Sequence, residues 1–400
     1  MKETGRYRIT DFDFWKITIS LALASFFVFA ALYAVQPLLP VFVDTFGVSV
    51  SVSSLALSMV IIGLIIGLIV FGFLSDRLGR TFLIKASLLG SVVPFLLIPL
   101  TNSFIILIIL RFIQGLLLAG LPAASLAYIS EEIESRSVGT ATGFYISSNA
   151  LGGMAGRVMT GYFTDHFSWE TAFFILAAIG TLVVLIVYIM LPQSKFFEKS
   201  VVSIRTDLIG FFYHLKNPAL LLMFGMGVVL QSTFTGMWTY LPFYLQGEPF
   251  LLSLQAISYM FLAYGFGVIG SPMAGSLSGK YGIKPVRVTG IIVLSGGVLL
   301  TIIPSLPMIM IGLCLSCLGF FTAHSVTAAS ISDQVTHHKG SASSLYLVAY
   351  YIGVSSGSTL YGPVWERIGW KGVIVIAGLI PVIYIGILQF FNKRNSHPSY

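Results

Sequence analysis

The stretch Gly72-Phe-Leu-Ser-Asp76-Arg77-Leu-Gly79-Arg80 is a short charged turn between two apolar runs, and the rest of the chain is organised around it. A second, less charged copy, Gly275-Ser-Leu-Ser-Gly279-Lys280-Tyr-Gly282-Ile283, follows 203 residues later. Both copies come after the second apolar run of their half and keep Gly, Ser, a basic residue and Gly at the same spacing. A fixed internal offset of this kind indicates a repeated structural unit.

A matching offset recurs near the end of each half. Five pairs of equivalent positions lie 201 residues apart: Gly152 and Gly353, Gly156 and Gly357, Gly161 and Gly362, Asp165 and Glu366, and Trp169 and Trp370. The chain is therefore two homologous halves, residues 1–192 and 217–400, joined by a polar linker at residues 193–216. We expect the glycines of the fifth apolar run, and their equivalents in the eleventh, to permit close approach to a helix of the other half.

The composition places both halves in a membrane. Hydrophobic residues make up 56% of the chain, charged residues only 9%, and the mean hydropathy is +0.93, whereas charged residues are about 25% of a soluble domain. Apolar runs of about 20 residues can cross a hydrocarbon core of about 30 Å as helices. Twelve such runs predict an all-α membrane protein of two pseudo-symmetric six-helix bundles, at 16–42, 52–74, 82–100, 104–128, 138–163 and 171–192, then 217–245, 251–275, 286–304, 307–331, 340–364 and 371–391.

The basic residues predict the orientation. Eighteen Lys and Arg residues fall on the side that holds both termini, whereas the opposite loops hold only Arg367 and Lys371. Because cytoplasmic loops carry the excess of Lys and Arg, both termini are expected in the cytoplasm and the chain in the bacterial cytoplasmic membrane. The same asymmetry accounts for the net charge of +7 without nucleic acid as a partner.

Two arginines lie inside predicted spans. Counted from the outer ends of the fourth and fifth runs, Arg111 and Arg157 lie about 10 Å and about 9 Å deep at 1.5 Å per residue, and an intramembrane charge indicates a functional site. None of the fifteen Asp and Glu residues lies in the hydrocarbon interior. The two arginines must therefore meet water, an anionic ligand, or backbone carbonyls that would make them structural pins between helices.

Polar and aromatic stripes on the first and seventh runs predict two walls of one cavity, although ordinary helix packing would also use such residues. Together with the arginines, the predicted substrate-binding residues are Tyr33, Gln36, Arg111, Gln114, Asn149, Arg157, Gln231 and Trp238. Because Arg offers a forked donor that matches carboxylate or phosphate, we expect a small organic anion or zwitterion as substrate. Asp44 and His324 are weak candidates for proton coupling.

Other chemistry is not indicated. The chain has no Gly-x-x-x-x-Gly-Lys-Ser/Thr loop and no Ser, His and acid cluster, so neither an ATP-driven pump nor an enzyme is expected, and no cofactor is implied. Cys314 and Cys317 fall one helical turn apart in the tenth run. Buried apolar-like cysteines are more usual there than a metal pair, and we predict no metal site.

The charged turn, the Arg111-x-x-Gln114-Gly115 element, the glycine-rich fifth run and the six-plus-six repeat resemble the major facilitator superfamily, in particular its bacterial drug and metabolite efflux branch, over nearly the whole chain. The fifth run reads Gly152-x-x-x-Gly156-Arg157-x-x-Thr160-Gly161, so Arg157 stands where the efflux branch has a Pro.

The resemblance implies proton-driven export by alternating access, with a cavity between the halves. It also implies a cytoplasmic gate, with Asp76 as a latch on a helix N-terminus of the other half or on a base such as Arg136. The gating residues are then Gly72, Asp76, Arg77, Gly79, Arg80 and Arg136.

Several functions remain open at this point. The expected one is proton-coupled export of a carboxylate-bearing metabolite, an opine-like metal chelator or a drug, by a monomer in the lipid bilayer. The alternatives are a proton-coupled uptake symporter for a small anionic metabolite, broad multidrug efflux, and a channel or passive receptor.

Overall fold

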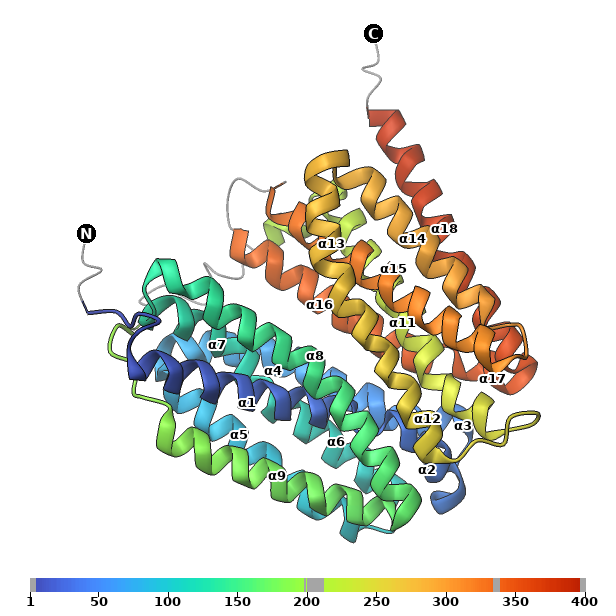
Figure 1. Cartoon of the computed structure of the whole chain (residues 1–400), viewed down its shortest axis with the longest axis horizontal. Coiled ribbons are helices and arrows are strands. Elements are labelled where there is room, and N and C mark those ends of the chain that lie inside the picture. The colour runs from blue at the N-terminus through green and yellow to red at the C-terminus, as the bar shows by residue number, and fades with distance from the viewer. Residues whose placement is uncertain (1–4, 198, 200–211, 334–338, 396–400) are drawn as a thin grey trace. The chain divides into compact units, whose positions relative to one another are not determined.

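The computed structural model describes residues 5–197, 199, 212–333 and 339–395, and these residues are predominantly helical (Figure 1). Within these ranges there is no β-strand, only an isolated bridge between Tyr7 and Ile133. The chain forms two compact units. Unit 1 comprises Met1–Val48, Leu55–Val201 and Ser253–Phe261, and unit 2 comprises Ser49–Ser54, Val202–Leu252 and Leu262–Tyr400. Each unit therefore gathers one half of the repeat and one short segment from the other half.

Unit 1 contains the helices of the N-terminal half and one short helix from the C-terminal half. They are α1 (Phe12–Tyr33), η1 (Gln36–Leu38), α2 (Leu39–Phe46), α4 (Leu55–Leu78), α5 (Arg80–Leu97), η2 (Ile98–Leu100), α6 (Phe104–Leu118), α7 (Gly120–Glu132), α8 (Ser135–His166), α9 (Trp169–Met190) and α12 (Leu254–Met260).

Unit 2 has the reciprocal composition. Its helices are α3 (Val50–Ser53), α11 (Pro218–Gln246), α13 (Gly265–Tyr281), α14 (Ile283–Leu300), α15 (Leu306–Asp333), α16 (Lys339–Thr359), α17 (Gly362–Ile368) and α18 (Trp370–Asn395). The 3-10 turn η3 (Phe261–Tyr264) begins at the last residue of unit 1 and continues into unit 2.

Each of the twelve predicted runs coincides with one helix or with consecutive helices. Ten segments of the described chain are long and apolar enough to cross a membrane. The other two runs form α8 and α16, where many Gly, Ser and Thr residues lower the mean hydropathy. The prediction of an all-α membrane protein with two six-helix halves is confirmed.

Proline interrupts the first run at a defined place. The run divides into α1, η1 and α2, with Pro37 and Pro40 in the first turns of the second and third pieces. Proline has no backbone N–H and therefore cannot continue the preceding hydrogen-bond ladder. The side chain of Gln36 is thus held at a break in the helix.

The two copies of the charged turn have the same backbone geometry. Gly79 and Gly282, at equivalent positions of the repeat, have φ values of +101° and +86°. Residues with a Cβ atom rarely adopt this region, whereas glycine does so readily. The repeated glycine is therefore required by the turn that joins α4 to α5 and α13 to α14.

At most of the predicted glycines, the helix that approaches closely belongs to the same half of the chain. A Cβ atom at Gly156 would lie 2.5 Å from the carbonyl oxygen of Ala30 on α1, and one at Gly357 would lie 2.5 Å from that of Ser232 on α11. Of the fifth-run glycines, only Gly161 contacts a residue from the other half of the sequence, Ser258. The expectation of cross-half packing was wrong for Gly152 and Gly156, because α8 packs lengthwise on α1.

Candidate functional site

Arg157 is held inside unit 1 by oxygen acceptors from two helices. Its side chain is only 3% exposed. The Nε–H donates to Oε1 of Gln36 at 2.7 Å, and Nη1 donates to the carbonyl oxygen of Gly153 at 2.7 Å. Gln36 is the first residue after the break that follows α1, and the break places its side chain next to Arg157.

Two aromatic rings complete the surroundings of Arg157. Its guanidinium carbon lies 4.1 Å from the ring centre of Tyr33 and 5.2 Å from that of Phe261. A cation over an aromatic face is stabilised by the ring quadrupole, more strongly where water is excluded. Arg157 is therefore a positioned, desolvated cation with a planar donor fork, which is suited to bind an anionic group.

Thr160, one turn further along α8, fixes the end of α1. Its hydroxyl lies 2.7 Å from the carbonyl oxygen of Ala34 and 2.8 Å from that of Gly156. Carbonyls at a helix C-terminus lack an intrahelical partner, so this hydroxyl satisfies a group that the break exposes. The site around Arg157 is thereby held rigid on both α1 and α8.

Arg111 has a different environment. It is fully buried, and its guanidinium donates to the backbone carbonyls of Ala31, Leu32 and Ala56 at 3.0, 2.9 and 3.1 Å. It also donates to Gln114 Oε1 at 2.5 Å, and the amide of Gln114 donates to the carbonyl of Ser91. We therefore revise the expectation that Arg111 and Gln114 bind substrate: the contacts favour the alternative of a structural pin, here between α6, α1 and α4.

Asn149 is also placed apart from the Arg157 contacts. Its Oδ1 accepts a hydrogen bond from the hydroxyl of Ser25 on α1. Asn149 therefore adds to the polar seam between α8 and α1.

The predicted residues of unit 2 lie along α11. Gln231 donates from Nε2 to the hydroxyl of Thr235 at 2.9 Å, while its Oε1 is buried without a hydrogen-bond partner in the described part of the chain. Trp238 is fully buried, with its ring centre 4.9 Å from that of Tyr264 and 6.2 Å from that of Phe234. These side chains form an aromatic wall with an available carbonyl acceptor.

The charged turn in unit 1 is an ion-pair network. Arg80 pairs with Asp76, donates to Ser75 Oγ at 2.8 Å, and lies 2.8 Å from Glu131 Oε1 on α7. Arg77 donates to the carbonyl of Phe73 at 3.0 Å. Asp76 was predicted to latch on a helix N-terminus of the other half or on a base such as Arg136; the base that pairs with it within unit 1 is Arg80, four residues along the same turn.

The remaining gating and coupling candidates are scattered. Gly72 has open space around it, and exposed Arg136 lines a surface depression with Arg8 and Glu134. Asp44 is exposed in α2. His324 on α15 lies 2.9 Å through Nδ1 from the hydroxyl of Tyr346 on α16, which makes it the better-connected of the two proton candidates.

Two residues near these candidates were missed by sequence reasoning. Phe261 contacts Arg157, but no sequence spacing links a ring in the eighth run to a cation in the fifth. Arg287, the second residue of the predicted ninth run, was counted among the eighteen basic residues of the cytoplasmic side, yet it is only 9% exposed in α14. In both cases the environment of the side chain depends on which helices pack together, and no local pattern in the sequence indicates this.

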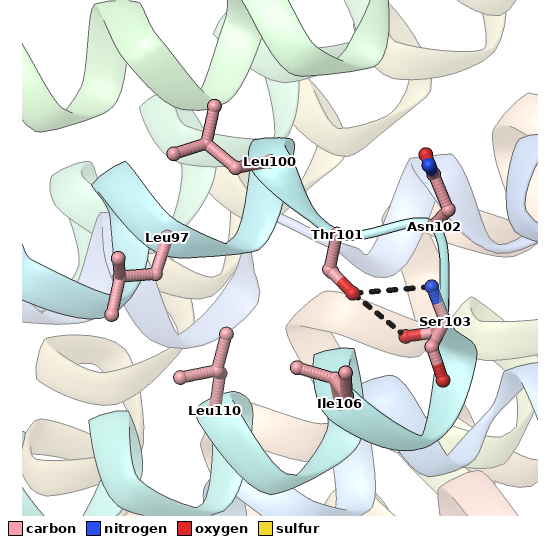
Figure 2. A pocket seen from close by; sticks show the side chains of 7 residues that line it. All are labelled: Leu97, Leu100, Thr101, Asn102, Ser103, Ile106 and Leu110. Carbon is pink, nitrogen blue, oxygen red and sulfur yellow. Dashed lines mark hydrogen bonds between the residues drawn. The ribbon is translucent and has the colours of Figure 1, made fainter.

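A depression at the junction of α5, η2 and α6 is shown in Figure 2. Its walls are the leucine and isoleucine side chains of Leu97, Leu100, Ile106 and Leu110, and its rim is the loop in which Thr101 contacts the amide and carbonyl of Ser103 at 3.1 and 3.4 Å. No charged residue lines it. This surface, apolar with an uncharged polar rim, does not have the character of an anion site.

The fold, with its many helices of membrane-spanning length, is that of a polytopic membrane protein. The family model of the Major Facilitator Superfamily matches residues 21–261 and 244–399. The chain belongs to the major facilitator superfamily, as the sequence indicated, and is a multi-pass membrane transporter and not an enzyme.

Individual relatives agree with this assignment. The inner membrane transport protein YnfM of Escherichia coli K12 is 37% identical over 385 residues, covering 96% of this chain and 92% of its own. The uncharacterized MFS-type transporter YybF of Bacillus subtilis 168 is 35% identical over 386 residues, covering 96% of both. A crystal structure of the nucleoside transporter NupG shares the fold, with a TM-score of 0.78 at 15% identity over 93% of this chain and 99% of that one.

Proposed function

We propose that the protein exports a small organic anion or zwitterion, most simply a carboxylate-bearing metabolite, across the bacterial cytoplasmic membrane by proton-coupled alternating access, with both termini in the cytoplasm. The name of the Escherichia coli relative, an inner membrane transport protein, supports the location. The lysine and arginine asymmetry of the loops supports the orientation.

The environment of Arg157 supports the proposed class of substrate. A guanidinium held by Gln36 and flanked by Tyr33 and Phe261 presents positive charge where a lipophilic cation would be repelled. A carboxylate can accept two parallel hydrogen bonds from one guanidinium, which adds geometric selectivity to charge attraction. Aromatic neighbours favour a substrate that has an apolar or aromatic portion beside its anionic group.

His324 is our preferred group for the coupling proton. An imidazole can take up and release a proton, and the hydroxyl of Tyr346 fixes the ring through Nδ1. The exposed position of Asp44 gives it no comparable contact with the helices of unit 1.

Transport in everted membrane vesicles tests the proposal. Vesicles that contain the protein should accumulate a labelled carboxylate from a panel of small metabolites when respiration makes the lumen acidic, and an uncoupler should abolish the accumulation. Vesicles that carry Arg157→Ala serve as the matched control. Accumulation only in right-side-out vesicles would identify an uptake symporter, and accumulation of lipophilic cations would contradict an anion site.

A further inference from the structure

Arg287 is a buried cation in unit 2 for which the described residues supply no oxygen acceptor. It is the fifth residue of α14 and is 9% exposed. Its one hydrogen bond within the described residues runs from Nη1 to the thioether sulfur of Met223 on α11, at 3.2 Å. A thioether is a weak acceptor, so the described residues compensate the charge of Arg287 only weakly.

A comparison with Arg111 and Arg157, two further buried arginines, shows how unusual this environment is. Arg111 donates to three backbone carbonyls and an amide oxygen, and Arg157 donates to an amide oxygen and a carbonyl. Within the described ranges, Arg287 forms no ion pair with a carboxylate. Because an unpaired charge is costly to bury, a site of this kind is expected to be completed by an anion.

Snorkelling does not explain the position. Arg287 lies four residues, about 6 Å at 1.5 Å per residue, from the start of α14, so its side chain could reach the end of the helix. Lys284, one turn earlier in the same helix, is exposed. Arg287 is instead enclosed by protein, because the side chain is directed at Met223.

A phenol and an imidazole belong to the same packed region as this cation. The hydroxyl of Tyr346 lies 2.9 Å from Nδ1 of His324. The ring of Tyr346 occupies the space that a side chain at Gly227 on α11 would fill, one helical turn from Met223, which Arg287 contacts. The cluster therefore draws on α11, α14, α15 and α16, four helices that lie together in the part of Figure 1 coloured from yellow-green to red.

Aromatic rings surround the histidine of this cluster. The ring of His324 is stacked on Phe320 with 5.5 Å between centres, and its centre lies 4.9 Å from that of Tyr350. His324 and Tyr350 are both half-buried, whereas Phe320 and Tyr346 are buried. Of these four side chains, His324 and Tyr350 therefore retain the most accessible surface.

We infer that Arg287, Tyr346 and His324 form a second anion-binding site, in unit 2, which takes the carboxylate of a small aromatic monoacid. One guanidinium balances one negative charge, so a monoanion fits better than a phosphate dianion. The planar fork of Arg287 matches a carboxylate, and the half-buried ring of Tyr350, beside His324, offers a flat face to an aromatic body. The inference rests on the proposed transport of carboxylates and adds a recognition site in the second half of the chain.

Binding of benzoate to the purified full-length protein tests this site. Benzamide, which has the same ring and no charge, is the matched probe. Wild-type protein should bind benzoate saturably in calorimetry and benzamide at least about tenfold more weakly, since hydrogen bonds between ionised partners are stronger than those to a neutral amide. Arg287→Met should weaken benzoate binding about tenfold or more, and Tyr346→Phe by a smaller factor. Lys284→Met, in the same helix, should leave it unchanged.

Several results would overturn the inference: no saturable benzoate binding by the wild type, equal affinity for benzamide, or unchanged affinity in Arg287→Met. If Arg287→Met does not fold, Arg287→Lys decides, because it keeps the charge and loses the fork and should still weaken binding severalfold. The proposed export is judged separately. If benzoate binding depends on Arg287 but no carboxylate accumulates in everted vesicles, the second anion site is supported and the proposed export is contradicted. If carboxylate accumulates but Arg287→Met binds benzoate like the wild type, the export is supported and the second site is contradicted.

Discussion

Asp165 and Glu366, which are 201 residues apart at equivalent positions of the repeat, each accept a hydrogen bond from the first turn of a short helix that comes from the other half of the sequence. Asp165 Oδ1 lies 3.2 Å from the amide nitrogen of Leu254 in α12, within unit 1. Glu366 Oε1 lies 3.0 Å from the amide nitrogen of Ser51 in α3, within unit 2. A carboxylate at a helix N-terminus satisfies a free amide and interacts favourably with the helix dipole.

Glu366→Gln should loosen α3 at neutral pH. The hydroxyl of Ser49 and the amide of Ser51 lower the pKa of Glu366 below its ordinary value of 4.5, so the carboxylate is fully charged at pH 7. Since the pKa is lower in the folded state, the stabilisation is complete above about pH 4.5 and is lost as the pH falls through the lowered pKa. Hydrogen exchange of the amides of residues 50–53, corrected for intrinsic rates, should be faster in the variant at pH 7. Glu248→Gln is the control, and equal exchange in both variants would contradict a contribution of Glu366 to the stability of α3.

Arg157→Lys should raise the half-saturating substrate concentration about tenfold, about 1.4 kcal/mol, with little loss of protein in the membrane. Lysine keeps the charge but loses the planar fork that spans Gln36 and Gly153. Initial rates in everted vesicles, measured with the carboxylate that the wild type accumulates, give the comparison. A half-saturating concentration equal to that of the wild type in Arg157→Ala would show that Arg157 does not contact substrate.

Arg111→Ala should act on stability first. It leaves the carbonyls of Ala31, Leu32 and Ala56 without the donors that Arg111 supplies, and a buried unsatisfied polar group costs about 1–3 kcal/mol. We expect a melting temperature well below that of both the wild type and Arg157→Lys, and reduced yield from the membrane. If the variant melts like the wild type but binds substrate poorly, Arg111 contributes to substrate binding and not mainly to stability.

Gly156→Leu should abolish folding or transport, because its side chain would enter the space of Ala30, whose Cα lies 2.6 Å from the position of a Cβ atom. Gly143, on the same helix, has no atom within 4 Å of that position and supplies a matched control. Gly143→Leu should therefore leave yield and transport near the values of the wild type. Equal damage by both substitutions would mean that helix propensity, and not the approach of α1, requires glycine in α8.

Arg80→Ala should slow transport more than Asp76→Asn. The first substitution removes contacts to Asp76, Glu131 and Ser75 together, while the second leaves Arg80 paired with Glu131. Both proteins should remain in the membrane at amounts close to that of the wild type, since the turn lies at the ends of α4 and α5. Turnover per molecule in vesicles measures the effect, and a ranking in the opposite order would give Asp76 a partner other than Arg80.

The sequence by itself determined the number of spans, the repeat and the turn glycines. Run length and composition act on neighbouring residues, and so does the positive φ of Gly79 and Gly282, so these properties can be recognised locally. Arg111 and Arg157 carried the same sequence signal, a charge within an apolar run, and only the tertiary structure separated them. Their partners lie 55, 79 and 80 residues away for Arg111, and 121 residues away for Arg157. The helix that packs against a side chain decides whether carbonyls, aromatic rings or a sulfur atom surround its charge, and that choice is made by the fold as a whole.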